Sequence, residues 1–225
     1  MKILTIDTST NLGSIGILED TELIAQMDLN LPTTHNQRLI KGIETLLEWT
    51  KIKLNSVELL TVVHGPGSFT GLRIGVATAK GLAYALDKPL IGINGLDALA
   101  SNFPFSRYLI CPILDARKKQ VFTALYEARG SDVIRISEYN SIIPEKLLKG
   151  LRRKTIFTGT GVKIYKDLIS QKMKERCLLA PEHLQRIYPQ GVARLALKIF
   201  KKGGDFHPAQ LTPFYIRPSD AELNY

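Results

Sequence analysis

The stretch Lys2-Ile3-Leu4-Thr5-Ile6-Asp7-Thr8-Ser9 opens the chain, rich in isoleucine and leucine and closed by a carboxylate and two hydroxyls. This composition is typical of a β-strand that ends in a polar turn. Two further strand-like segments, residues 12–19 and 22–29, follow after links of only two residues. Links this short join antiparallel strands, so the first thirty or so residues are predicted to form an antiparallel meander.

Beyond the meander, helical and strand-like segments alternate, and the same order then recurs in the second half of the chain. The predicted segments of the first half are a helix at 34–50, a buried strand at 57–64, a Gly-rich loop at 65–71, a helix at 72–86, a strand at 89–93 and a short helix from Gly95. Those of the second half are strands at 108–115, 120–126 and 133–138, a helix at 144–151, a strand at 154–158, a helix at 162–174, a strand at 177–180 and a helix at 189–202.

Each half therefore has the order βββαβαβα, which predicts an α/β protein with one mixed five-stranded sheet in each of two lobes. We expect the N-terminal lobe over residues 1–104, the C-terminal lobe over 105–204, and a tail, 205–225, that packs back on the first lobe. Both lobes close their first strand with an aspartate, Asp7 and Asp115. This duplicated order resembles the actin-like, Hsp70-like and sugar-kinase-like ATPase fold (ASKHA, ribonuclease H-like), in which two lobes face a nucleotide cleft.

The composition is that of an ordinary globular protein, with 44% hydrophobic and 23% charged residues in 225. The longest apolar runs are far shorter than the roughly 18 residues of a membrane span. Met1 is followed at once by a strand-like segment, which predicts no secretory signal. We therefore expect a cytoplasmic protein without a membrane contact.

Positive charge is concentrated in the second half. Residues 1–100 carry 8 Lys and Arg against 10 Asp and Glu, whereas residues 101–225 carry 22 against 11. Clusters such as Arg152-Arg153-Lys154 suit a phosphate backbone and are candidates for a contact with nucleic acid. The alternative is a solvated basic face with no partner, because no RNA-binding motif with stacking aromatic residues accompanies the charge.

The stretch His64-Gly65-Pro66-Gly67-Ser68-Phe69-Thr70-Gly71-Leu72-Arg73-Ile74-Gly75 lies between a predicted strand and a predicted helix. Backbone N–H groups at a helix N-terminus can hold an anion, so one interpretation is a phosphate loop. The other is a tight turn in which glycines supply positive φ and Thr70 caps the helix. The candidate residues near an anion or nucleotide are Asp7, Gly65, Gly67, Ser68, Thr70, Gly71 and Asp115.

If these residues act together, the chain is an autonomous ATP-dependent phosphotransferase, with Asp7 and Asp115 around Mg²⁺ and the Gly-rich loop or residues 158–161 around phosphates. For each aspartate the alternative is structural, an Asx turn at Asp7 and an Asp115–Arg117 pair. The four histidines are too far apart for an HxxxH pair, and no nucleophile signature is present, which predicts neither a metal site nor a catalytic residue. Cys111 and Cys177 stand singly and are expected to be reduced core residues.

Four segments together resemble the TsaB family, also called YeaZ, over nearly the whole chain. They are residues 3–9, residues 65–75, Asp115-Ala116-Arg117, and Pro213-Phe214-Tyr215-Ile216-Arg217 followed by Ala221-Glu222. The resemblance implies a bacterial, non-catalytic accessory subunit for the synthesis of N6-threonylcarbamoyladenosine in tRNA. In that family a paralogue, TsaD, performs the transfer with a metal held by an HxxxH helix, and the ATPase TsaE binds the TsaB–TsaD pair.

The resemblance also implies partners and cofactors. The chain is expected to form a heterodimer with TsaD, a homodimer when alone, and a contact with tRNA through the complex. No cofactor is required, although ATP or ADP is expected at the subunit boundary in the complex. The two histidines of TsaD are placed near Ile93 and Asp97, and neither residue supplies an imidazole.

The pairing surface implied by the family is the helices at 34–50 and 72–86. The first has apolar residues on two adjacent faces and the second is dense in glycine and alanine, which allows close helix approach. The alternative is a wide apolar stripe that is buried within the monomer. The predicted contact residues are Leu39, Ile43, Arg73, Ala77, Lys80 and Tyr84.

Overall fold

The computed structural model describes residues 1–30 and 35–217. The predicted helix start at Pro32-Thr33-Thr34 and the end of the family motif, Ala221-Glu222, lie outside the described residues. The chain forms two compact units. The N-terminal unit consists of Met1–Gly95 with Ile187–Phe214, and the C-terminal unit of Leu96–Arg186 with residues 215–217.

The N-terminal unit contains the predicted five-stranded mixed sheet, in the order β3-β2-β1-β4-β5. The pairs β1–β2 and β2–β3 are antiparallel, as the two-residue links predicted, whereas β1–β4 and β4–β5 are parallel. The strands are β1 (Lys2–Asp7), β2 (Gly13–Glu19), β3 (Glu22–Leu29), β4 (Leu59–Gly65) and β5 (Leu90–Asn94). The helices are α1 (His35–Thr50), α2 (Phe69–Leu86), α6 (Pro189–Lys201) and the 3₁₀ turns η1 (Leu54–Ser56) and η4 (Pro208–Gln210).

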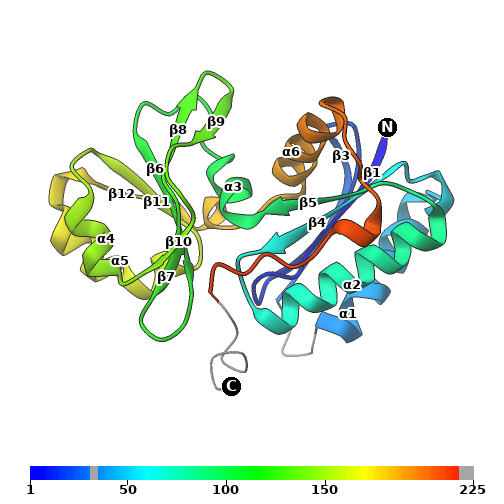
Figure 1. Cartoon of the computed structure of the whole chain (residues 1–225), viewed down its shortest axis with the longest axis horizontal. Coiled ribbons are helices and arrows are strands. Elements are labelled where there is room, and N and C mark those ends of the chain that lie inside the picture. Colours follow the sequence, from blue (N-terminus) through cyan, green and yellow to red (C-terminus); the bar gives the residue numbers. More distant parts are fainter. Residues whose placement is uncertain (31–34, 218–225) are drawn as a thin grey trace. The chain divides into compact units, whose positions relative to one another are not determined.

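Helices cover both faces of this sheet. The side chains of Leu4 and Ile6 on β1 pack in one core with residues of α1 and α2. Helix α6 lies on the opposite face of the sheet (Figure 1). At that second face Gly16 lets the start of α6 approach, because a Cβ there would lie 2.4 Å from the Cβ of Pro189. Helix α6 therefore belongs to the N-terminal unit, which differs from the predicted lobe of residues 105–204.

The C-terminal unit has a seven-stranded sheet instead of a second five-stranded one. Strands β10, β7, β6, β11 and β12 are neighbours in that order, and β8 and β9 branch from β6. The strands are β6 (Leu109–Asp115), β7 (Val121–Thr123), β8 (Tyr126–Arg129), β9 (Asp132–Arg135), β10 (Asn140–Ile142), β11 (Thr155–Thr158) and β12 (Cys177–Leu179). The helices are α3 (Gly95–Ala100), α4 (Pro144–Gly150), α5 (Gly161–Met173) and the 3₁₀ turns η2 (Lys174–Arg176) and η3 (Glu182–Gln185).

The difference arises at the predicted strand 120–126, which is divided into β7 and β8. Strand β7 pairs with the carboxyl-terminal half of β6, whereas β8 pairs with β6 at Ile110, near its start. Strands β7 and β8 therefore pair with different halves of β6. The N-terminal unit has no such division, so the two sheets are not alike. Cys111 is buried in this core and Cys177 is only partly buried, and both are free thiols. In the part of the chain that the structure describes, no helix is both long and apolar enough to cross a bilayer.

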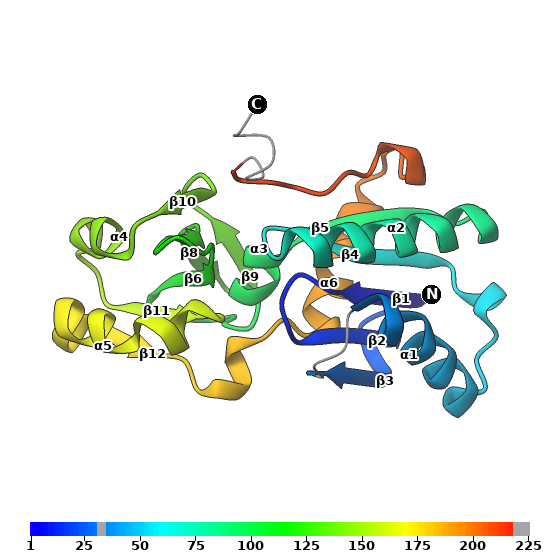
Figure 2. The ribbon, with the colours of Figure 1, turned by 90° about the horizontal axis from the view of Figure 1, so that it is seen from below.

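A C-terminal segment, residues 206–214, runs along the N-terminal unit beside α2 (Figures 1 and 2). The N–H of Leu90 donates to the carbonyl of Phe206, and the N–H of Phe214 donates to that of His64. Between them, Lys80 Nζ donates to the carbonyls of Ala209 and Leu211, at 3.2 and 3.0 Å. Residues 206–214 of the predicted tail are therefore held on the N-terminal unit.

Candidate functional site

The Gly-rich loop and the first turns of α2 pack against the end of β1. A Cβ on Gly67 would lie 2.2 Å from the carbonyl oxygen of Ser9, and one on Gly71 would lie 2.1 Å from that of Thr8. Heavy atoms do not approach so closely, so only glycine fits these positions. The loop is thus built for close contact with the carboxyl end of the first strand.

Polar groups of the loop are used within the chain. The N–H of Ser68 donates to the carbonyl of Ser9 at 2.7 Å, and the Thr8 hydroxyl donates to the carbonyl of Gly71 at 2.7 Å. Ser68, and not Thr70 as predicted, caps α2: its hydroxyl accepts the N–H of Gly71 at 3.3 Å, and Thr70 is exposed. This bonding favours a structural role for the loop, and its phosphate binding stays a prediction.

Gly65 has a different constraint. Its φ is +145°, which L-residues rarely adopt, and a Cβ on it would lie 2.1 Å from the carbonyl oxygen of Phe214. The loop therefore also accommodates the C-terminal segment.

Asp7 is buried at the end of β1. Its Oδ1 accepts the N–H of Ser9 at 2.8 Å, which makes the Asx turn that the sequence left open. Burial raises the pKa of Asp7 to about 6, and the Asp28 carboxylate adds to the shift, whereas hydrogen bonds with Ser9 oppose it. The adjoining cavity, lined by Asp7, Ser14 and Arg38 among others, has a volume of about 10 Å³, space for one water molecule.

Asp7→Asn is expected to stabilise the protein at neutral pH. The folded state binds more protons than the unfolded state between the unfolded pKa of 3.8 and the folded pKa of about 6, so wild-type stability falls as pH rises through that window. Asparagine removes the cost of burying the ionised carboxylate. The free energy of unfolding should therefore rise by about 1–3 kcal/mol at pH 7 and stay unchanged below pH 4, where the carboxyl is protonated in both states. Urea unfolding at both pH values measures it, and an equal difference at pH 4 and pH 7 would contradict the assignment.

Asp115 has a local role as well. Its Oδ1 accepts the N–H of Arg117 at 3.0 Å, and its Oδ2 lies 3.8 Å from Arg117 Nε. The arrangement is the structural Asp–Arg pair considered from the sequence. Within residues 1–30 and 35–217, no three His, Cys, Asp or Glu side chains lie close enough together to hold a metal ion.

The exposed face of α2 carries most of the predicted contact residues. Arg73, Ala77 and Tyr84 are exposed, and the Arg73 guanidinium lies 3.7 Å from the centre of the Phe69 ring. Gly81, in the same row, is also exposed, and a Cβ there would have no neighbour within 4 Å. Lys80 instead holds the C-terminal segment through its two carbonyl contacts, so its Nζ is used within the chain.

The prediction for α1 needs correction. Leu39 and Ile43 are 3% and 4% exposed and pack in the core beneath the helix. The width of the apolar stripe did not show which side faces the sheet, and these two side chains are on that side. The exposed apolar side chains of α1 are Ile40 and Trp49, at 45% and 73%.

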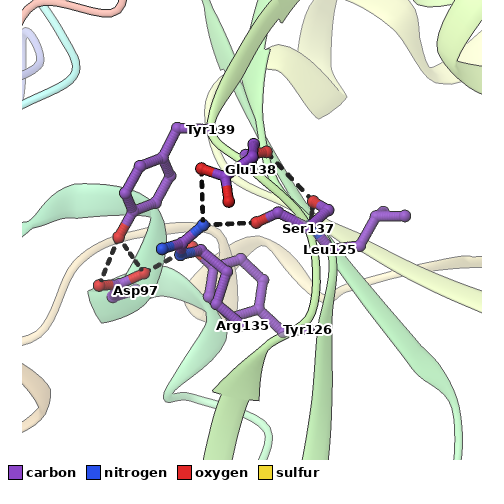
Figure 3. Close-up of polar contacts among 7 residues, drawn as sticks. All are labelled: Asp97, Leu125, Tyr126, Arg135, Ser137, Glu138 and Tyr139. Carbon is purple, nitrogen blue, oxygen red and sulfur yellow. Dashed lines mark hydrogen bonds and ion pairs between the residues drawn. The ribbon is translucent and has the colours of Figure 1, made fainter.

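A polar cluster in the C-terminal unit surrounds Asp97 (Figure 3). The hydroxyl of Tyr126 donates to Asp97 Oδ1 at 2.7 Å, and that of Tyr139 donates to both carboxylate oxygens at 2.8 Å. The Arg135 guanidinium lies 4.1 Å from the centre of the Tyr139 ring. Burial, followed by the charge of Asp97, raises the pKa of both tyrosines, so both remain donors at neutral pH. The cluster ties α3 to the branch formed by β8 and β9.

The two positions near which the resemblance places the TsaD histidines lie in different elements of this chain. Ile93 lies in β5 and is buried, whereas Asp97 lies in α3, so the two positions do not share a helix as an HxxxH pair requires. The helix begins at Gly95, and none of its residues is a histidine. The sequence singled out Asp97 but not Tyr126 or Tyr139. These tyrosines lie 29 and 42 residues further along the chain, and no local sequence pattern connects them with Asp97.

Asp97→Ala is expected to destabilise the protein more than Tyr126→Phe. The first leaves the Tyr126 hydroxyl, on a side chain only 1% exposed, without this acceptor, whereas the second leaves Asp97 bonded to Tyr139. We expect losses of about 3 and about 1.5 kcal/mol in urea unfolding. In the Asp97→Ala background, Tyr126→Phe should then lower the free energy of unfolding by almost nothing. If the two losses were strictly additive, the hydrogen bond between Tyr126 and Asp97 would not contribute to stability.

The basic residues Arg152, Arg153 and Lys154 are exposed in the segment before β11. Arg153 forms an ion pair with Glu127 of β8. Neither Arg152 nor Lys154 has a carboxylate partner among the described residues. The structure therefore leaves these two charges available at the surface.

An antiparallel meander that passes into parallel crossovers, with helices on both faces, defines the actin-like class of α/β proteins. The solved structure of YeaZ from Pseudomonas aeruginosa shares this fold, with a TM-score of 0.81 over 95% of this chain and 99% of that chain at 24% identity. The family model described as "TsaD: tRNA N6-adenosine threonylcarbamoyltransferase" matches residues 31–225. The chain belongs to the TsaB (YeaZ) family of proteins for tRNA threonylcarbamoyladenosine biosynthesis.

Relatives over the full length support this assignment. The "tRNA threonylcarbamoyladenosine biosynthesis protein TsaB" of Bacillus subtilis (strain 168) is 31% identical over 228 residues, which cover 100% of this chain and 98% of that protein. The TsaB of Escherichia coli (strain K12) is 26% identical over 226 residues, which cover 96% of this chain and 95% of that protein. The resemblance inferred from the sequence is therefore confirmed.

Proposed function

We propose that this chain is a non-catalytic accessory subunit in the synthesis of N6-threonylcarbamoyladenosine in tRNA and that it forms a heterodimer with a TsaD-type transferase. Family membership supports the pathway. The pairing surface that we propose is the exposed face of α2, formed by Arg73, Ala77, Gly81 and Tyr84.

Gly81 is the observation that carries the pairing proposal. Glycine inside a helix costs about 0.5–1 kcal/mol relative to alanine. At Gly65, Gly67 and Gly71 a close approach within the chain explains the glycine, but at Gly81 nothing lies within 4 Å of an added Cβ. A partner helix packed closely on this face would supply the missing reason. The exposed Trp49 on α1 supplies a large apolar anchor of the kind common at interfaces.

The other partners belong to the same proposal. When TsaD is absent, the α2 face pairs two copies of this chain as a homodimer. A TsaE-type ATPase binds the TsaB–TsaD pair, and ATP or ADP binds at the subunit boundary of the complex without being required by this chain. The metal and the transfer chemistry belong to the TsaD-type subunit in this proposal, as the family resemblance implies.

Native mass spectrometry of the chain with and without a TsaD-type protein tests this proposal. We expect a homodimer alone and a one-to-one heterodimer in the mixture. A chain that stays monomeric in both samples would refute the pairing. Calorimetry with Mg-ATP on the chain alone tests the alternative phosphotransferase, which predicts micromolar binding that Asp7→Asn abolishes.

A further inference from the structure

The C-terminal unit has a strongly basic edge at the amino-terminal ends of three parallel strands. Leu109 of β6 is in register with Thr155 of β11, and Thr155 is in register with Cys177 of β12. Residues just before these strands therefore lie along one edge of the sheet. We call this set the basic edge, and it consists of Arg107, Arg152, Arg153, Lys154, Lys174 and Arg176.

Contacts within the chain hold this edge together but neutralise little of it. The Arg176 guanidinium donates to the carbonyl of Leu151 at 2.7 Å, which ties η2 to the segment before β11. Glu127 pairs with Arg153. Among the described residues, Arg107, Arg152 and Lys154 have no carboxylate within ion-pair distance. Glu175, between Lys174 and Arg176, is a second carboxylate of this region, so six cations stand against Glu127 and Glu175 and the edge presents a net positive charge to solvent.

Aromatic side chains accompany these charges, which sequence reasoning missed. Tyr108 lies between two of the cations: Arg107 Nη2 donates to its hydroxyl at 2.9 Å, and Lys154 Nζ is 5.4 Å from the centre of its ring. The hydrogen bond from Arg107, with the charges of Arg107 and Lys154, lowers the pKa of the Tyr108 hydroxyl. Tyr108 thus contacts the charged groups of both Arg107 and Lys154 and brings them together at the edge.

Phe105, in the loop before β6, is 74% exposed. Its φ is +59°, a conformation that is unfavourable for a bulky residue, and its N–H donates to the carbonyl of Gly130 in the β8–β9 turn at 2.8 Å. The bond to the turn thereby fixes the backbone at Phe105, whose side chain is mostly exposed. An exposed aromatic ring two residues before Arg107, in a region where several cations lack a carboxylate partner among the described residues, is a combination suited to single-stranded nucleic acid.

We propose that the basic edge binds RNA, with phosphates on Arg107, Arg152 and Lys154 and an unpaired base stacked on Phe105. The inference rests on the proposed function, since the RNA that meets a subunit of this pathway is the tRNA that is modified. An acidic protein surface would account for the cations but not for the exposed ring, whereas a single-stranded loop or end of an RNA accounts for both.

Fluorescence anisotropy of a labelled, unmodified tRNA transcript tests the charges, first with the full chain alone and then with the TsaD-type protein added. The double variant Arg152→Glu/Lys154→Glu is expected to weaken binding at least tenfold and to lower the salt dependence of log K by about 1.5, since two phosphate contacts are lost. Lys163→Glu is the control for a charge reversal away from the edge: it lies near the other end of α5, about 16 Å from Lys174 at 1.5 Å per residue, and should bind as wild type.

A second pair of variants tests the ring. Phe105→Ala should weaken binding about tenfold with an unchanged salt dependence, because a stacked base is lost without a change of charge. Phe105→Trp should restore it. Equal losses for Phe105→Ala and Phe105→Trp would overturn the stacking role.

Pairing with the TsaD-type protein, measured on the same variants by native mass spectrometry, separates the two proposals. If the wild-type chain pairs but the double variant binds tRNA as tightly as wild type, the RNA site is overturned and the proposed function stands. If the double variant loses pairing and keeps tRNA affinity, the basic edge is a protein interface and the inference is wrong. Loss of tRNA affinity with intact pairing is the result that we expect.

Discussion

Gly71→Ala is expected to abolish stable folding of the N-terminal unit. The added Cβ would lie 2.1 Å from the carbonyl oxygen of Thr8, a backbone atom at the end of β1. To make room, α2 would have to leave the strand and break the bond from the Thr8 hydroxyl to the carbonyl of Gly71. We expect a loss of about 4 kcal/mol or more, which is a large fraction of the stability of an ordinary domain.

Gly81→Ala is the matched control on the same helix. Nothing lies within 4 Å of its Cβ, so the methyl group costs no contact and should stabilise the chain by about 0.5–1 kcal/mol. Urea unfolding followed by circular dichroism measures both variants. If Gly71→Ala unfolds at the wild-type urea concentration, then the close approach of α2 to β1 does not exist in solution, and the Gly-rich loop is free for the phosphate binding that its sequence first indicated.

The order of the elements in the N-terminal unit could be predicted because local signals fix it. The predicted links, 10–11 and 20–21, are too short for anything but antiparallel neighbours; the structure has links at 8–12 and 20–21, both still short, and the meander is observed. The end of β1 at Asp7 and the start of α3 at Gly95 follow from the same kind of evidence. Such signals act within a few residues, so tertiary packing does not override them.

Long-range choices could not be predicted in this way. The apolar stripe of α6 shows that one face is buried, but not that the sheet of the N-terminal unit, instead of that of the predicted lobe 105–204, buries it. The same holds for α1, which has apolar residues on two adjacent faces. The sequence does not show which face packs on the sheet, and the structure places Leu39 and Ile43 on that face. At the α2 terminus, Ser68 and Thr70 are both good capping residues, and only the point where the helix begins, Phe69, decides between them.

The basic edge shows a third limit. Arg107, Lys154 and Arg176 are far apart in the sequence, and the parallel register of β6, β11 and β12 brings their segments together. The charge of each segment was visible, but the aromatic residues near the cluster Arg152-Arg153-Lys154 were not, because that cluster precedes β11 whereas Phe105 and Tyr108 precede β6. A basic cluster should therefore be judged together with the residues that precede neighbouring strands.

Ala77→Asp is expected to lower the affinity for a TsaD-type partner at least a hundredfold. Ala77 is exposed in this chain, so the carboxylate should cost little stability in the monomer. In a close helix pair the same carboxylate would be buried without a partner, at a cost of about 3–5 kcal/mol. Gln171→Asp, which adds the same charge to an exposed position of α5, should pair as wild type.

Gly81→Ala sharpens this test because one methyl group should act in opposite directions on folding and on pairing. It raises the stability of the chain for the reason given above, yet it separates two helices that approach closely and should weaken the heterodimer. Titration of each variant against the TsaD-type protein, read by native mass spectrometry, gives the affinities. A variant that is both more stable and equally well paired would show that the partner does not pack on this face, and the exposed glycine of α2 would then need another explanation.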